Sequence, residues 1–167
     1  MTLVGMRASG KSTVGRATAI LLGCPCIDAD AALEERLGCS IAAWFARAGE
    51  ASFREREAAC LVELLAGVQP FVLATGGGAV VRRENRTLLA HSGGIVVYLH
   101  AEAAHLQERL RADAGNRPSL TGAAVADEVS ALLAVRDPWY REIATHVLPA
   151  VESVDALAAR IAALARA

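Results

Sequence analysis

The sequence lacks the features that would place it in a membrane, in a secretory route or on nucleic acid. No segment reaches the roughly 18 apolar residues that a membrane-spanning helix requires. Gly5, Arg7 and Lys11 interrupt the N-terminal stretch where a signal peptide would need an apolar core. The formal net charge is only −1, so no overall positive field attracts nucleic acid or anionic lipid. We therefore expect a cytoplasmic protein that binds neither.

The sequence also lacks a cysteine or histidine pattern that would suit a metal. The four cysteines form no CxxC pair and match no zinc-site spacing with histidine. They are Cys24, Cys26, Cys39 and Cys60. The four histidines show no partner pattern either. We expect reduced thiols, as in a reducing cytosol, and no metal-thiolate site.

No repeat, low-complexity tract or linker divides the 167 residues, and this length suits a single domain, 1–167. Short apolar runs alternate with longer helical patterns. The expected strands are 2–4, 24–27, 71–74, 94–99 and 146–148. The expected helices are 11–22, a stretch ending at 37, 40–48, 50–65, 83–90, 101–112, a stretch ending near 135, and 153–166. This alternation predicts an α/β three-layer sandwich with a mainly parallel, five-stranded sheet.

The most specific motif is G-x-x-x-x-G-K-[ST], which the sequence GMRASGKST satisfies at residues 5–13. It follows an expected strand and opens an expected helix, which is the context that a phosphate-binding loop needs. Gly5 and Gly10 allow the backbone to turn successive N–H groups toward phosphate, and the helix adds its positive N-terminal dipole. Lys11 can reach the β- and γ-phosphates, and Ser12 can ligate Mg²⁺. A glycine-rich turn with an accidental lysine is the alternative, and the strand–loop–helix context disfavours it.

Two acids, Asp28 and Asp30, follow the second expected strand. Ligands of parallel sheets bind at the carboxyl ends of the strands, so these carboxylates should lie near Lys11. In an extended segment, residues two apart face the same side, so both acids can serve one site. One acid could hold Mg²⁺ through water and the other could accept a hydroxyl proton. Alternatively the acids cap the following helix, and the two roles are compatible.

Three consecutive glycines, Gly76, Gly77 and Gly78, follow the expected strand 71–74. Each costs about 0.5–1 kcal/mol in backbone entropy relative to alanine. Close approach of backbone to a ligand would account for that cost, and a tight strand-to-helix turn would account for it equally well.

Three arginines stand out by placement: Arg54, Arg117 and Arg136. Spacing alone does not favour them over Arg56 or Arg141, because charged side chains mostly lie on the surface.

Taken together, the ordered motifs resemble the shikimate kinase family over nearly the whole chain. The matching segments are GMRASGKST at 5–13, DAD at 28–30, GEASFRERE at 49–57, ATGGGAV at 74–80, NRPSL at 116–120 and RDPWY at 136–140. The resemblance implies a P-loop kinase fold and transfer of the γ-phosphate of ATP to the 3-hydroxyl of shikimate, with Mg²⁺ as cofactor. It implies that ATP and shikimate are the partners of what we expect to be a monomer.

On the nucleotide side, the resemblance implies that the phosphate loop and two arginines bind ATP. These residues are Gly5, Ala8, Ser9, Gly10, Lys11, Ser12, Thr13, Arg109 and Arg117. Arg109 is the candidate that stacks near adenine, with Arg111 as the alternative. Arg117 belongs to an expected mobile lid at about 113–122 and would reach the transferring phosphate. Ser12 and, through water, Asp28 would hold Mg²⁺.

On the acceptor side, the resemblance implies that Asp30 binds the acceptor hydroxyls and is the candidate proton acceptor. Arg54 and Arg136 would grip the carboxylate, and the backbone at 76–78 would contact the substrate. The catalytic residues implied are Lys11, Asp30 and Arg117.

Three departures from the family pattern concern affinity more than activity: Ala8 for glycine, and Ser119 and Trp139 for leucine. The alternatives are another small hydroxy-acid kinase, such as one for gluconate, and a nucleotide-binding module without turnover.

Overall fold

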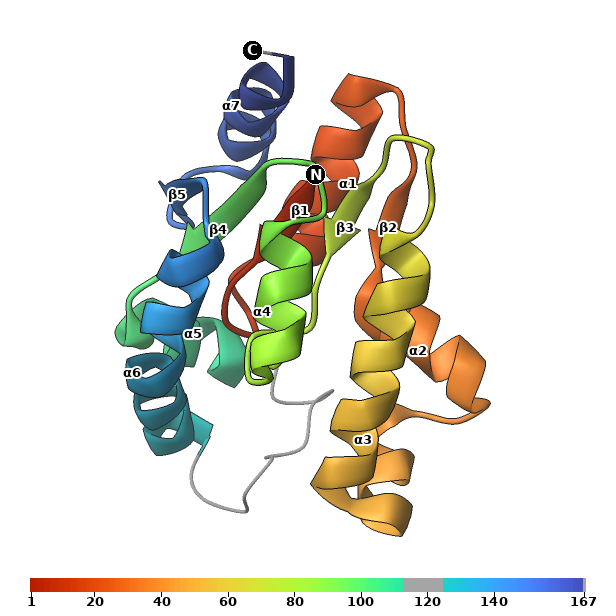
Figure 1. The fold of residues 1–167 in the computed structure, drawn as a ribbon. Helices are drawn as coiled ribbons and strands as arrows, with labels where there is room; N and C mark the ends of the chain where they lie inside the picture. Colours follow the sequence, from red (N-terminus) through yellow and green to blue (C-terminus); the bar gives the residue numbers. More distant parts are fainter. Residues whose placement is uncertain (113–124, 167) are drawn as a thin grey trace.

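Five parallel strands form one sheet at the centre of the protein, whose residues 1–112 and 125–166 are described by a computed structural model (Figure 1). The sheet order is β2-β3-β1-β4-β5, and every pair of neighbours is parallel. The strands are β1 (Thr2–Val4), β2 (Cys26–Asp28), β3 (Val72–Ala74), β4 (Val96–His100) and β5 (His146–Pro149). The expected α/β class and five-stranded parallel sheet are confirmed.

Helices cover both faces of this sheet, because parallel strands need crossover connections that return over it. The helices are α1 (Lys11–Leu22), α2 (Ala29–Leu37), α3 (Ile41–Leu65), α4 (Arg83–Ala90), α5 (Ala103–Ala112), α6 (Val125–Ile143) and α7 (Val154–Arg166). The helices α1 and α7 pack together, while α4 packs against α3 and α6. Figure 1 shows α2 and α3 on the side of the edge strand β2, and α5 and α6 on the side of the edge strand β5.

The main core lies between the sheet and these helices. Residues of the central strands, including Leu3, Leu73 and Val97, are fully buried. A second, smaller cluster consists of Leu33, Phe53 and Cys60, with partly buried neighbours from α2 and α3. The phosphate loop follows a strand of the main core, whereas α2 and α3 pack around a small core of their own.

Several element boundaries agree with expectation, and two glycines end helices at the expected places. Helices α1 and α4 have the predicted bounds, and Gly23 and Gly38 cap α1 and α2 in left-handed conformation. The expected helices 40–48 and 50–65 form one element, α3, with a non-helical kink at Gly49. Strand β2 begins two residues later than expected and includes Asp28.

The prediction that a helix ends near 135 is wrong. Helix α6 continues to Ile143 and contains Pro138, although an interior proline removes a helical hydrogen bond and costs about 3 kcal/mol. Contacts on both sides of Pro138 hold the helix in place. Tyr98 donates a hydrogen bond to Asp137 Oδ1 (2.9 Å), and Arg141 donates one to Asp137 Oδ2 (2.7 Å). The segment 136–140 is therefore helical.

Candidate active site

The phosphate loop connects β1 to α1 at the carboxyl edge of the sheet, and its backbone conformation depends on its glycines. Gly5 and Gly10 have φ angles of 146° and 92°, in the region that favours glycine. A Cβ atom on Gly5 would also lie 2.7 Å from the carbonyl oxygen of Leu99. Ala8, where the family pattern has glycine, adopts φ 64° in the same loop. The loop thus keeps a left-handed residue at position 8 despite the added methyl group.

Lys11 begins helix α1 and its side chain folds into the phosphate loop. Its ammonium group donates hydrogen bonds to the carbonyl oxygens of Gly5 (2.9 Å) and Met6 (2.8 Å). The residue is 7% exposed. The ammonium group is thus buried with backbone partners inside the loop whose N–H groups and helix N-terminus favour a phosphate.

Ser12 and Asp28 face each other across the loop, with Ser12 Oγ donating to Asp28 Oδ2 at 2.6 Å. This pair offers only hard oxygen ligands, which is the kind that Mg²⁺ prefers. The described residues hold no cluster of three or more metal-ligating His, Cys, Asp or Glu side chains. That donor set fits Mg²⁺, which is usually bound by one or two protein oxygens together with waters and substrate phosphates.

Asp28 also caps helix α2, so the capping alternative is correct for this acid. Its Oδ1 accepts hydrogen bonds from the backbone N–H groups of Asp30 (3.1 Å) and Ala31 (3.3 Å). Asp30 consequently lies in the first turn of α2, not in an extended segment. The prediction of an extended segment that includes Asp30 is therefore wrong, although both acids still lie near the carboxyl edge of the sheet.

The three glycines after β3 approach other site residues closely. None of them is among the residues with positive φ, so backbone conformation does not require glycine here. A Cβ atom on Gly76 would collide with the Asp30 carboxylate, and one on Gly78 would collide with the Arg54 guanidinium. On Gly77 it would lie 2.9 Å from the backbone nitrogen of Arg7 in the phosphate loop. The turn is thus the point where phosphate loop, Asp30 and Arg54 meet.

Arg54 is held in place by two glutamates of its own helix, α3. Its Nη1 donates to Glu57 Oε2 at 2.8 Å, and its Nη2 lies 3.1 Å from Glu50 Oε1. The side chains of Arg54 and Glu57 are 12% and 8% exposed. Burial raises the pKa of the Glu57 carboxyl, and the adjacent Arg54 charge opposes that rise. A guanidinium fixed in this way is oriented before a carboxylate ligand arrives.

From the other side, α6 brings Arg136 and Tyr140 to the same turn. Arg136 Nη1 donates to the carbonyl oxygen of Gly77 at 3.2 Å, and the Tyr140 hydroxyl donates to the same oxygen at 2.5 Å. Both residues are buried. The two arginines named for carboxylate binding therefore lie against adjacent glycines.

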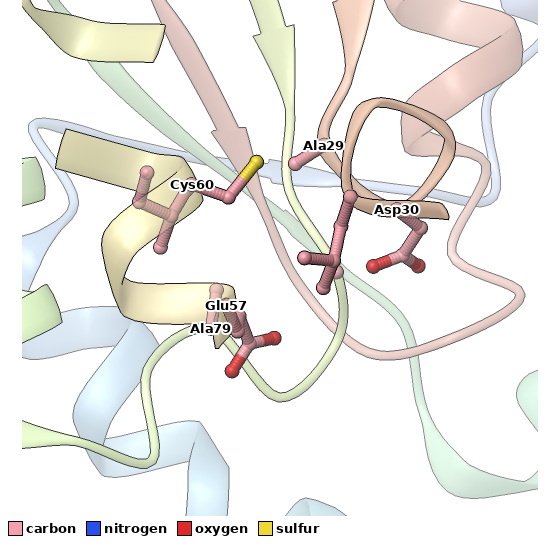
Figure 2. A pocket seen from close by; sticks show the side chains of 8 residues that line it. Ala29, Asp30, Glu57, Cys60 and Ala79 are labelled. Atoms are coloured by element: carbon pink, nitrogen blue, oxygen red, sulfur yellow. The ribbon is translucent and has the colours of Figure 1, made fainter. Parts of the chain in front are cut away.

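A small cavity beside this turn is lined by Asp30, Glu57, Cys60 and Gly76, among others (Figure 2). Figure 2 shows Asp30 and Glu57 on different helices around the cavity, with the Cys60 sulfur directed toward Ala29. The cavity has room for about one water molecule. A larger hollow of about 480 Å³ lies at the opposite, amino-terminal edge of the sheet, next to Met1 and Phe71. It contains none of the predicted site residues.

Of the two candidates for the adenine-stacking arginine, Arg109 contacts the phosphate loop, and its role at adenine stays a prediction. Its guanidinium donates to the carbonyl oxygens of Ala8 (3.2 Å) and Ala150 (2.7 Å), which connects the phosphate loop to the segment after β5. Arg109 and Arg111 are both exposed and both lie in the last turn of α5. Arg117 and the expected lid at 113–122, with Ser119, lie outside the described residues, and their roles stay predictions.

Two residues of the site were not singled out from the sequence. Glu57 is a partner of Arg54, and the (i, i+3) spacing of the two on a helix could have indicated this. Tyr140 enters the sequence argument only as part of the segment RDPWY at 136–140. Its contact with Gly77 joins positions 63 residues apart, and no local signal in the sequence reveals such a contact.

Comparison with known proteins decides the family. The family model described as "Shikimate kinase" matches residues 7–165. The chain belongs to the shikimate kinase family. A shikimate kinase of Oleidesulfovibrio alaskensis is 47% identical over 161 residues, which covers 95% of this chain and 92% of that relative. The protein is accordingly an ATP-dependent kinase that acts on a hydroxyl group.

Solved structures agree with this family assignment. The shikimate kinase of Acinetobacter baumannii, solved in complex with shikimate, has a TM-score of 0.90 and 39% identity. The match covers 98% of this chain and 90% of that one. A gluconokinase from Sinorhizobium meliloti, at 23% identity and a TM-score of 0.62, covers 99% of this chain and 92% of its own. The likeness between this chain and the gluconokinase concerns the fold alone.

None of the described helices is long and apolar enough to cross a membrane.

Proposed function

We propose that this member of the shikimate kinase family transfers the γ-phosphate of ATP to the 3-hydroxyl of shikimate, giving shikimate 3-phosphate and ADP. The observation that carries the proposal is the glycine turn at 76–78. It lies against Asp30, the phosphate loop, Arg54 and Arg136 at once. A compact acid with several hydroxyl groups matches two guanidinium groups on one side and a carboxylate on the other.

In this proposal, Arg54 and Arg136 bind the acceptor carboxylate and Asp30 aligns the reacting hydroxyl and accepts its proton. Lys11 follows the γ-phosphate and stabilises the charge on its oxygens during in-line transfer. Magnesium, held by Ser12 and through water by Asp28, supplies further positive charge at the phosphates. Arg109 is proposed to contact the adenine. The sequence also predicts a role for Arg117 at the transferring phosphate.

We also propose that the protein acts as a cytoplasmic monomer. The support for a reducing compartment is chemical: the four cysteines are free thiols in the structure. The residues described for the proposed site lie on one chain, so these contacts need no second copy of the protein. Light scattering across a tenfold concentration range would reveal a dimer if one forms.

A coupled assay of ADP release tests the function directly. Purified protein with ATP and Mg²⁺ is offered shikimate, gluconate, another ring hydroxy acid such as quinate, or no acceptor. Of the acceptors offered, we expect only shikimate to give rapid ADP release. NMR of the product should show the phosphate on the 3-hydroxyl. Preference for gluconate would identify the rival kinase activity. Nucleotide binding without ADP release from any acceptor would identify a non-catalytic module.

A further inference from the structure

One carbonyl group in the site accepts two hydrogen bonds from α6. The oxygen of Gly77 receives the Tyr140 hydroxyl at 2.5 Å and Arg136 Nη1 at 3.2 Å. The Tyr140 oxygen also lies 3.6 Å from the sulfur of Met6 in the phosphate loop. Tyr140 is fully buried. Its hydroxyl therefore contacts the acceptor-side turn and the phosphate loop together.

The position of this carbonyl fixes the direction of an amide donor. A trans peptide is planar and its C=O and N–H groups point in opposite directions. When the Gly77 oxygen is held toward α6, the N–H of Gly78 must point away from α6. Within the described part of the chain, no backbone carbonyl accepts a hydrogen bond from this N–H. The glycines on either side have their carbonyl oxygens occupied, Gly76 by Ala79 N–H and Gly78 by Val81 N–H.

We propose that Tyr140 is a positioning residue for the acceptor: its hydroxyl holds the Gly77–Gly78 peptide so that the Gly78 amide and the Arg136 guanidinium both face the acceptor carboxylate. This inference rests on the proposed function and adds a residue to it. Glycine makes the restraint necessary, because a peptide between two glycines can reorient more readily than any other.

Tyr140 also keeps Arg136 available for the acceptor. Without the hydroxyl, the Gly77 oxygen has only Arg136 as a partner from α6, and a charged donor binds a carbonyl more strongly than a neutral one does. Arg136 would then be drawn toward the protein backbone and away from the acceptor. The hydroxyl remains a donor across the working pH range, because burial raises the pKa of Tyr140.

The test is Tyr140→Phe, which removes one oxygen and keeps the ring. Tyr98→Phe is the matched control, since Tyr98 stacks on Tyr140 with ring centroids 4.9 Å apart and donates to Asp137 on the same helix. Each variant loses one buried hydroxyl: that of Tyr98 donates to α6, and that of Tyr140 lies on α6 itself. Only the Tyr140 hydroxyl contacts the acceptor turn. Both should be assayed well below the lower of their melting temperatures.

We expect Tyr140→Phe to raise KM for shikimate about tenfold, with kcat and KM for ATP within about twofold of wild type. Tyr98→Phe should lower the melting temperature comparably and leave KM for shikimate within about twofold. Isothermal titration of each variant with shikimate should reproduce the split without turnover. An unchanged acceptor KM in Tyr140→Phe, or an equal rise in both variants, would overturn the positioning role. A wild type inactive on shikimate would refute the proposed function as well.

Discussion

The phosphate loop and the acceptor side use glycine for different physical reasons. In the phosphate loop, Gly5 and Gly10 adopt positive φ angles that side chains disfavour. On the acceptor side, Gly76, Gly77 and Gly78 have ordinary backbone conformations, and a Cβ atom would collide with neighbouring site groups or press closely on them. One region needs glycine for conformation and the other for space.

The two regions also differ in how they are assembled. The phosphate loop is a single stretch that follows a strand of the main core and leads into α1. The acceptor side collects residues from α2, α3, the turn after β3, and α6, and two of these helices pack around the small cluster of Leu33, Phe53 and Cys60. Changes in the phosphate loop should therefore affect ATP binding and phosphoryl transfer, while changes on the acceptor side should affect the affinity for shikimate.

The largest effect should come from Lys11→Ala. Removing the ammonium group takes away charge stabilisation at the transferring phosphate, so kcat should fall about 10³-fold or more. Lys11 is the only lysine in the sequence, so it and the N-terminal amine are the only targets for amine acetylation. ATP should protect Lys11 from acetylation and shikimate should not, as peptide mass spectrometry can show. Near-wild-type turnover of the variant would contradict the assignment.

Arg136→Ala should sharpen the contrast between the two regions, because it should weaken binding of the acceptor and leave ATP binding unchanged. Loss of a charged hydrogen-bonding group should raise KM for shikimate roughly 10- to 100-fold while KM for ATP changes little. Arg141→Ala is the control on the same helix, because Arg141 is half exposed and pairs with Asp137. Initial-rate kinetics with both substrates varied will separate the two constants. An unchanged shikimate KM would exclude Arg136 from the acceptor site.

The pair Gly78→Ala and Gly10→Ala tests the two uses of glycine directly. Gly78→Ala should displace Arg54 from Glu57 and raise KM for shikimate about five- to tenfold, with little effect on ATP. Gly10→Ala has room for its methyl group, 3.8 Å from Val14, but forces φ 92° on alanine. Its cost should appear in stability and in ATP binding, at about 1–2 kcal/mol. If both variants changed the same substrate constant, the distinction would fail.

The sequence predicted the phosphate loop, which is one contiguous segment, better than the acceptor side, which is assembled from several segments. The motif at 5–13 carries its own context, because the strand, loop and helix are adjacent in the chain. The glycine caps Gly23 and Gly38 were likewise readable locally. The strand order β2-β3-β1-β4-β5 follows from packing of distant segments, and no local pattern specified it.

On the acceptor side, tertiary contacts overrode local signals. The alternation argument put Asp30 in an extended segment, but Asp28 begins α2 first by accepting two backbone N–H groups. The helix was expected to end near 135, yet Tyr98 and Gly77 hold α6 on both sides of Pro138. Only the resemblance to a family singled out Arg54 and Arg136, because spacing alone did not distinguish them from other arginines.

The smallest effect should come from Ala8→Gly, which restores the family's residue in the phosphate loop. Ala8 adopts φ 64°, where alanine is strained and glycine is not. The gain from removing this strain exceeds the added entropy of glycine in the unfolded chain, so the variant should be about 0.5–1 kcal/mol more stable. Urea unfolding measures this directly, and Ala17→Gly in helix α1 is the control that should lose about as much stability. A variant less stable than wild type would contradict this prediction, because it would mean that the entropy cost of glycine exceeds the strain at Ala8.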